Sequence, residues 1–542
     1  MNTQQSFLKG TAILIFANAI SKILGAIFKI PLTYILKEEG MAIFNTAMGV
    51  YSTVLTFVIS GIPLALSRMI AEDYALKNFQ NLKKTLKIST LILCALGLAG
   101  STIMLLFADF FAYSMKDPKA AFAIRAIAPS VFFVAWGNAY KSYYQGCVNM
   151  IPTAISQIIE AIVKLVAGFL AAFILKDAML EITSSGAISG ITIGEIIATF
   201  ILFTLSVPSV KAMQNTGKKS STKRICSSLA SIAVPMLICS CISGSVNLLD
   251  VATIRNGLLK ITFDNESAET FLLRYSSYTT SFDNLLKELK LSLDGARWLY
   301  GAYSGFALTL FHLPTGIIGA LGTGVLPVIS GALAKKDMHL VEKTTSLALK
   351  ITLIISLPSA FILGLFSEPL LDLLFNNTSS ALLLRELSPC LVFLCVSHLM
   401  TVILHSAGKI SEPFFYDMIG MGIKLIFNIL LIPNPYFNIS AAPLGSCVAF
   451  FIIMILDIYS IKRNLKISLN IKESVLKPLG ASVIMALVML LVYTPFSIIF
   501  TKELYSVTAT LFLGGVVYLL SLLSFGAITK NDFGRGKTRV NG

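Results

Sequence analysis

The sequence predicts an all-α, polytopic membrane protein with about fourteen transmembrane helices. Of its 542 residues, 55% are hydrophobic and only 13% are charged, whereas ordinary soluble domains carry roughly 25% charged residues. The mean hydropathy is +0.80. Apolar runs of roughly 20 residues, enough to cross a hydrocarbon layer of about 30 Å, recur from Leu8 to Phe525 with short polar breaks. No soluble core could absorb this much apolar surface.

The individual helices follow from reading each apolar run against the Gly, Pro and polar residues that interrupt it. The first run contains Lys22 and Lys29 and lacks a small-residue cleavage site, so we expect a retained helix rather than a cleaved signal peptide. The expected helices cover residues 8–30, 41–67, 86–112, 121–145, 151–175, 186–208, 225–250, 299–330, 346–367, 381–405, 413–433, 440–461, 476–500 and 504–526.

Positively charged residues are distributed as a cytoplasmic N-terminus predicts. Short cytoplasmic loops hold an excess of Lys and Arg, and alternate loops of this chain are rich in both. The inner loops would carry Arg68, Lys77, Lys83, Lys84, Lys211, Lys218, Lys219, Lys223, Arg224, Lys335, Lys336, Lys343, Lys462, Arg463, Lys466 and Lys472. The basic C-terminal tail then falls inside as well, so both termini are predicted to be cytoplasmic.

Internal sequence repeats predict that the chain has two similar halves. The segment around Leu66 and Ser67 recurs around Ile329 and Ser330, about 263 residues later. In a second repeated segment, Gly146 and Pro152 correspond to Gly408 and Pro413, at about the same separation. This separation keeps the same membrane orientation, so the repeats would be parallel and related by an axis along the membrane normal.

The expected organisation therefore has three parts. An N-terminal lobe of six helices covers residues 1–224, and a C-terminal lobe of six helices covers residues 225–461. The second lobe includes one long outer loop, residues 255–297, which is polar and mixed in charge. Two additional helices and the basic tail fill residues 462–542.

The composition also limits which partners and cofactors can be expected. The formal net charge of +15 would suggest nucleic acid in a soluble protein, but the basic residues here lie in short loops between spans, so we expect no nucleic-acid partner. The eight cysteines show no paired ligand spacing, so neither disulfides nor a metal site are expected. Phosphate-loop, nucleophile-elbow and HExxH motifs are missing from the sequence. We expect no cofactor, so the energy would have to come from a coupling cation, the membrane potential or the cargo gradient.

Ionisable residues inside the spans are the candidates for function, because each costs some kcal/mol at the bilayer centre and usually faces a partner or a wet cavity. Lys22 and Lys29 lie two turns apart on the first helix and share one face. Lys22 is too deep to reach water, whereas Lys29 has the alternative of snorkelling to the outer interface. Together they predict a cationic stripe.

The fifth and eleventh expected helices each carry a lysine near mid-membrane. Glu160 and Lys164 are four residues apart, which also fits an intrahelical ion pair of purely structural value. The repeat places Lys164 within about a residue of Lys424. Lysines from both halves would suit an anionic cargo such as a diphosphate. Glu195 and Asp250 would either bind a coupling cation or proton, or pair with the lysines.

The segment Lys141-Ser142-Tyr143-Tyr144-Gln145-Gly146, followed by Met150 to Gln157 and Glu160, resembles the polysaccharide transporter family of the multidrug/oligosaccharidyl-lipid/polysaccharide exporter superfamily. The matching stretches cover nearly the whole chain. They also include Ser21-Lys22-Ile23-Leu24-Gly25, Gly61-Ile62-Pro63-Leu64-Ala65-Leu66-Ser67-Arg68, and His312-Leu313-Pro314 running to Leu326-Pro327-Val328-Ile329-Ser330.

Within that family the sequence is most similar to the branch that holds the stage V sporulation protein B and the Gram-positive lipid II flippases. The resemblance implies fourteen helices and alternating access of two lobes around a cationic cavity. Lys22 and, with one residue of slippage, Lys29 match basic positions of the family. Lysine stands where lipid II flippases often have arginine, which keeps the charge but loses the bidentate fork. The candidate residues for an anionic head group are Lys22, Lys29, Lys141, Lys164 and Lys424.

We therefore expect a monomeric flippase in the cytoplasmic membrane of a bacterium, where it exports an undecaprenyl-diphosphate-linked cell-wall precursor. Its partners would be that lipid-linked oligosaccharide and membrane lipids. A cation-coupled multidrug exporter is the first alternative, although mostly cationic substrates would favour acidic cavity walls. A membrane glycan polymerase or glycosyltransferase is the second. The carboxylates that the outer loop could supply to such an enzyme are Asp264, Glu266, Asp283 and Asp294, which show no recognisable pairing.

Overall fold

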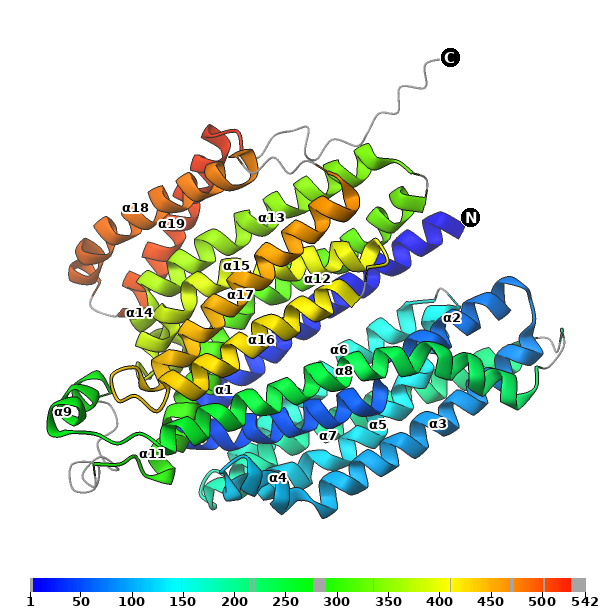
Figure 1. Cartoon of the computed structure of the whole chain (residues 1–542), viewed down its shortest axis with the longest axis horizontal. Helices are drawn as coiled ribbons and strands as arrows, with labels where there is room; N and C mark the ends of the chain where they lie inside the picture. The colour runs from blue at the N-terminus through cyan, green and yellow to red at the C-terminus, as the bar shows by residue number, and fades with distance from the viewer. Residues whose placement is uncertain are drawn as a thin grey trace. The chain divides into compact units, whose positions relative to one another are not determined.

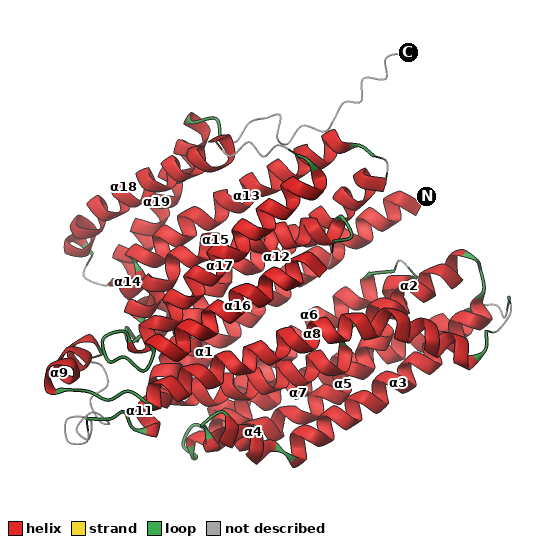
Figure 2. Ribbon diagram, in the orientation of Figure 1, coloured by secondary structure: helices red, strands yellow, loops and turns green. Residues whose placement is uncertain are grey.

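The computed structural model of the chain is built from helices (Figures 1 and 2). It describes residues 3–147, 149–213, 216–217, 220–275, 289–334, 336–409, 411–467, 472–500 and 503–527. Within these ranges, β structure is limited to an isolated bridge between Thr262 and Lys290. The all-α prediction is confirmed.

The first helix holds two of the expected spans. α1 runs over Thr3–Ile59, but its backbone leaves the helical region at Lys37, with φ 53° and ψ −163°. This kink divides the first expected span from the second. α2, Ile62–Ala75, follows a break at Gly61, where φ is 78° and Pro63 occupies the first turn.

The next helices follow the third to seventh expected spans in order. They are α3 (Phe79–Leu106) with the short α4 (Ala108–Ser114), α5 (Ala121–Gly146), α6 (Ile151–Ile174), α7 (Leu180–Ala212) and α8 (Thr222–Leu259). The predicted outer loop contains the short helices α9 (Asn265–Arg274) and α11 (Leu293–Gly301).

The remaining spans are also matched one by one. They are a π-helical turn at Ala302–Ala307 with α12 (Leu308–Ala334), α13 (Met338–Leu365) with the short α14 (Ser367–Phe375), α15 (Ala381–Ser406), α16 (Ser411–Leu431), α17 (Ala441–Leu465), α18 (Lys477–Ile499) and α19 (Glu503–Ser524). In the described part of the chain, 11 helices are long and apolar enough to cross a membrane. The first half of α1, α8 and α12 match the other three expected spans, and each includes residues whose side chains are not described. The chain is a polytopic membrane protein.

The two halves of the chain repeat the same series of elements at a separation of about 260 residues. α3, α4, α5, α6 and α7 recur as α13, α14, α15, α16 and α17. The breaks recur as well, because Lys77 and Lys336 both have positive φ before α3 and α13. Pro129 inside α5 likewise has its counterpart in Pro389 inside α15.

Two compact units make up the structure. Unit 1 comprises Met1–Thr309 with Met421–Ala442, and unit 2 comprises Leu310–Gly420 with Pro443–Gly542. The lobes expected at residues 1–224 and 225–461 follow the internal sequence repeat, whereas the two compact units follow the contacts between residues. The expected lobes stay a prediction.

A row of glycines brings α6 and α7 together in unit 1. Gly186, Gly190 and Gly194 recur every fourth residue on α7, and small residues at this spacing let membrane helices approach closely. A Cβ atom on Gly190 would lie 2.3 Å from the backbone nitrogen of Gly168 on α6, and one on Gly194 would lie 3.0 Å from the carbonyl oxygen of Glu160. The backbone that carries the charged residues of α6 is therefore fixed against α7.

Candidate functional site

Five charged side chains from four helices of unit 1 form one group, which we call the N-terminal charge cluster: Lys29 of α1, Lys141 of α5, Glu160 and Lys164 of α6, and Glu195 of α7. The Lys141 Nζ atom lies 3.5 Å from Glu160 Oε2. Glu195 is 8% exposed, and its carboxyl group faces that of Glu160 and interacts with both Lys141 and Lys164. Lys29 interacts electrostatically with Lys164.

Hydrogen bonds between the helices hold this cluster in place. The hydroxyl of Thr192 on α7 donates to the Ala126 carbonyl of α5 at 2.9 Å, and Thr199 donates to Phe133 in the same way at 2.8 Å. Ser21 of α1 donates to the Gln157 carbonyl of α6 at 3.2 Å. With the close α6–α7 contact, these bonds give the charged side chains a rigid frame.

The described part of the cluster contains one ion pair, and its lysines outnumber its glutamates. Glu160 forms its ion pair with Lys141, across two helices, rather than with Lys164 on its own helix. Within the described residues, Lys164 has no ion pair. Three lysines against two glutamates leave an excess of positive charge, so the arrangement can attract an anion.

Lys424 and Asp250 form a separate pair in unit 1. The Lys424 Nζ atom lies 2.6 Å from Asp250 Oδ2. The amide of Asn428 donates to the other oxygen of Asp250 at 2.8 Å and to the Thr253 hydroxyl at 3.2 Å. Lys424, the repeat counterpart of Lys164, is therefore already neutralised by a carboxylate. Lys22 lies on α1, but its side chain is outside the described part of the structure, and its role stays a prediction.

A buried ion triad, Asp117 with Arg255 and Arg297, lies at the predicted outer ends of the helices. Asp117 is 0% exposed, and its two carboxylate oxygens lie 2.8 Å from Arg255 and 2.9 Å from Arg297. Arg255 also covers the ring of Tyr300 at 4.9 Å. The sequence alone does not predict this triad, because its members are far apart in the chain and no spacing relates them.

Asp264 and Asp294, two of the outer-loop carboxylates that an enzyme would need, serve as structural groups, whereas Glu266 is exposed in the first turn of α9. Asp264 caps α9, and hydrogen bonds from the Ser267 hydroxyl and backbone N–H hold the pKa of Asp264 below its ordinary value. Asp294 pairs with Arg297 and lies 3.8 Å from Lys119. Asp283 lies outside the described residues.

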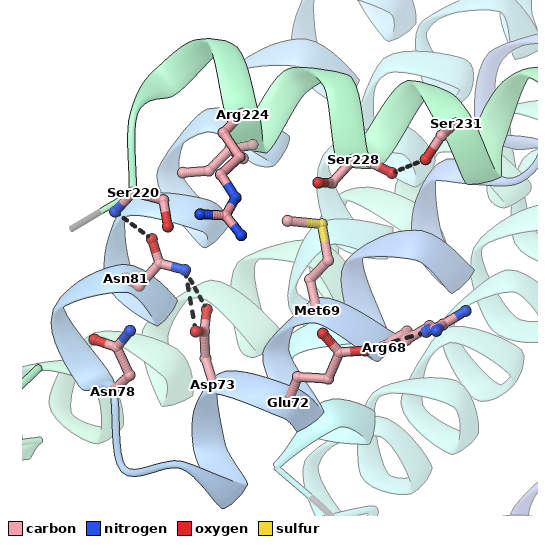
Figure 3. Close-up of a pocket in the computed structure, with 11 residues that line it drawn as sticks. Arg68, Met69, Glu72, Asp73, Asn78, Asn81, Ser220, Arg224, Ser228 and Ser231 are labelled. Carbon is pink, nitrogen blue, oxygen red and sulfur yellow. Dashed lines mark hydrogen bonds and ion pairs between the residues drawn. The ribbon is translucent and has the colours of Figure 1, made fainter. Parts of the chain in front are cut away.

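A polar cavity of about 450 Å³ lies where the predicted cytoplasmic ends of α2, α3 and α8 meet (Figure 3). Burial raises the pKa of Asp73 there, and the Asn81 amide donates to both of its oxygens at 3.0 and 2.8 Å. Asn81 in turn accepts the backbone N–H of Ser220 at 2.9 Å. Arg68 faces Glu72 at 3.2 Å. These contacts join the α2–α3 corner to the segment before α8, so they serve architecture.

An all-helical, many-span membrane fold with lysines and glutamates packed between its helices is typical of polytopic membrane transporters. The chain belongs to the polysaccharide biosynthesis protein family, whose model matches residues 7–333. A second family model, described as lipid II flippase MurJ, matches residues 300–516.

Curated relatives match nearly end to end. The chain is 24% identical to the stage V sporulation protein B of Bacillus subtilis, over 98% of each chain. It is 21% identical to the lipid II flippase MurJ of Bacillus subtilis, over 84% of this chain and 82% of that protein. The uncharacterized membrane protein YabM of the same organism is 23% identical over 97% of this chain and 93% of its own length.

Solved transporters share the fold. A structure titled lipid II flippase MurJ, inward closed conformation, aligns with a TM-score of 0.67 at 18% identity and covers 94% of this chain and 98% of that one. An inward-facing multidrug resistance MATE family transporter of the MOP superfamily aligns with a TM-score of 0.63 at 13% identity and covers 82% and 95%. The predicted fold is confirmed.

Proposed function

We propose that this protein is a flippase that moves an undecaprenyl-diphosphate-linked cell-wall precursor, lipid II or a related oligosaccharide lipid, from the inner to the outer leaflet. It would work by alternating access in the cytoplasmic membrane of a bacterium. Family membership and the flippase relatives support the class. The observation that supports an anionic cargo is the excess of lysine in the N-terminal charge cluster.

Two like charges in that cluster favour an anion. Lys29 and Lys164 interact electrostatically, and like charges repel more strongly where water is excluded than in bulk solvent. A bound diphosphate would offset this repulsion, because ammonium groups form charge-assisted hydrogen bonds to phosphate oxygens. The prenyl tail would stay in lipid, as the cargo needs only its polar head to enter.

The remaining ionisable groups take supporting roles in this proposal. Lys141 and Glu195 hold Glu160 in position, and Lys424 is neutralised by Asp250 in the conformation observed. The cargo head group therefore depends on Lys29 and Lys164 more than on Lys141 or Lys424. A coupling cation or the membrane potential would supply the energy, and the protein would act as a monomer with both termini in the cytoplasm.

A cargo comparison with the reconstituted wild type tests this function. We expect the protein to move a fluorescent lipid II analogue between leaflets under an imposed membrane potential or ion gradient. A cationic dye typical of multidrug exporters should not move under the same conditions. Transport of the dye without the lipid would reverse the assignment in favour of a drug exporter. Formation of a glycan product would favour the polymerase alternative.

A further inference from the structure

An apolar groove of about 610 Å³ lies between α13, α15 and α18 of unit 2 and has no part in the proposed function. α13 packs against both of the other helices, and α18 lies alongside it (Figure 1). The residues that line the groove include Leu357 and Phe361 of α13, Val392 of α15 and Leu479 of α18. Of the described residues in this lining, Arg385 of α15 alone is charged. The groove is therefore a hydrocarbon surface with a single cation.

A proline in α13 fixes α18 as one wall of this groove. Pro358 has no N–H group, so the Ile354 carbonyl one turn earlier loses its helical hydrogen bond. The Tyr518 hydroxyl of α19 donates to that carbonyl at 2.7 Å. Because α19 packs along α18, this bond ties both additional helices to α13. The wall that α18 provides is thus held by a specific contact.

A second proline shapes the groove on α15. Pro389 leaves the Arg385 carbonyl without its helical donor, and the Ser388 hydroxyl donates to this oxygen at 2.8 Å instead. The backbone of Arg385 is therefore satisfied within its own helix. Arg385 is exposed, and its guanidinium group forms no ion pair with any residue that the structure describes. An anion can reach it at the predicted outer end of α15.

The internal repeat supplies a direct comparison for this arginine. Arg125 and Arg385 are the fifth residues of α5 and α15, respectively. Arg125 forms an ion pair with Asp109, the second residue of α4. Glu368 is the second residue of α14, but no ion pair joins it to Arg385 in the described part of unit 2. The first repeat neutralises its arginine internally, whereas the second leaves the charge available to an external anion.

The dimensions of the groove match a lipid chain. From Leu357 to Leu365 the wall of α13 extends about 12 Å along the helix axis, which approaches half of the hydrocarbon thickness of about 30 Å. A peptide would leave backbone groups without hydrogen bonds among these apolar side chains, and a free inorganic anion would gain nothing from them. A hydrocarbon chain with an anionic head fits both parts of the groove. A phosphate head suits Arg385 in particular, because the planar guanidinium group binds two phosphate oxygens at once.

We propose that this groove holds one glycerophospholipid of the outer leaflet, with an acyl chain along α13 and its phosphate on Arg385. The phosphodiester of such a lipid carries a single negative charge, which one arginine neutralises. A diphosphate carries more charge, and the several lysines of the N-terminal charge cluster suit it better. The bound lipid would fill the space between α13, α15 and α18 and so support the two additional helices. The site does not depend on what the protein transports.

Native mass spectrometry of the full chain, delipidated in detergent and titrated with dioleoyl phosphatidylglycerol, tests this site. Arg385→Ala should weaken binding of the first lipid roughly tenfold, because a hydrogen bond to a charged phosphate is lost. Arg125→Ala is the matched control and should bind as the wild type does, since Arg125 is already paired. Ala360→Trp, which places a bulky ring on the wall of the groove, should weaken binding as well. Dioleoylglycerol, which lacks the phosphate, should bind the wild type far more weakly.

A photoreactive lipid locates the chain. Phosphatidylglycerol with a diazirine at the end of one acyl chain should label the wild type on peptides that contain Leu357 or Leu479. Equal binding by the wild type and Arg385→Ala, or labelling spread evenly over other helices, would overturn the proposal. Displacement of the phospholipid by a lower concentration of undecaprenyl phosphate would assign the groove to a prenyl chain instead. The wild-type labelling stands even if a variant fails to fold, and none of these readouts depends on transport.

Discussion

Lys164 and Lys424 hold equivalent places in the repeat, yet they lie in different electrostatic settings. Lys164 has no ion pair in the described structure, whereas Lys424 lies 2.6 Å from Asp250. The first is available to an anion, while the second already compensates a partly buried carboxylate. The same residue type therefore predicts transport defects at one position and stability defects at the other.

Removing Lys424 should destabilise the protein. In Lys424→Ala, Asp250, whose side chain is 18% exposed, loses its countercharge, and breaking a buried ion pair from one side costs roughly 3 kcal/mol or more. Thermal unfolding in detergent would measure the loss. The double variant with Asp250→Ala should recover part of it, and a single variant as stable as the wild type would refute the pairing.

The buried ion triad makes a second prediction about stability. Asp117→Asn leaves Arg255 and Arg297 without their shared carboxylate, so the free energy of unfolding should fall by about 3–5 kcal/mol. Asp109→Asn is the matched control, because Asp109 and Arg125 form a largely exposed pair and such pairs contribute about 0–1 kcal/mol. Equal effects of the two substitutions in an unfolding assay would contradict the triad's structural role.

The sequence shows which residues inside the spans are ionisable, but not which side chains they contact. Lys29, Lys164 and Glu195 were found because charge is rare in an apolar run. The Lys141–Glu160 pair and the role of Asp117 depend on how separate helices pack, which no spacing within one helix encodes.

At the element scale, the glycine row of α7 fixes where the charged residues of α6 lie. Gly190→Ala would place a Cβ atom 2.3 Å from a backbone nitrogen of α6, so the two helices must separate. Overpacking of this kind costs about 1–3 kcal/mol, and it would also displace Glu160 and Lys164. Gly515→Ala on α19 is the control, because its Cβ would meet nothing within 4 Å.

Both the thermal stability and the transport rate should fall in Gly190→Ala and remain unchanged in Gly515→Ala. A Gly190→Ala variant with wild-type stability would show that the α6–α7 contact is looser than described.

Hydropathy predicts that each helix is present, but it does not predict where some of the helices end. The second span was expected over residues 41–67, whereas α1 ends at Ile59 and α2 begins at Ile62. The positive φ of Gly61 and the Pro63 ring interrupt the backbone there. Hydropathy does not register this break, because Gly61, Ile62 and Pro63 are as compatible with a membrane span as their neighbours.

For the whole molecule, the order of elements and the internal repeat were both accessible from the sequence. The repeat is clear in the structure because short elements such as α4 and α14, and positive-φ residues such as Lys116 and Asn376, recur at matching places. The two compact units could not be predicted from the sequence, because Met421–Ala442 joins the N-terminal part through packing with residues such as Asp250.

The predicted membrane orientation has its own test. In a cysteine-free background, a cysteine at Lys176 should react with an impermeant maleimide in intact cells. A cysteine at Lys223 should react only after permeabilisation. Both side chains are exposed, so accessibility reports the side of the membrane rather than burial. The reverse pattern would place the termini outside.

Transfer of a fluorescent lipid II analogue across proteoliposomes tests the proposed head-group site directly. The vesicles would contain wild type, Lys164→Ala or Lys176→Ala at equal protein density. Lys176 is the matched control, since it is a solvent-exposed lysine just beyond the end of the same helix. We expect Lys164→Ala to slow transfer roughly tenfold or more, because it removes a charge-assisted contact to the diphosphate, and Lys176→Ala to behave as wild type. Wild-type transfer by Lys164→Ala would contradict the account.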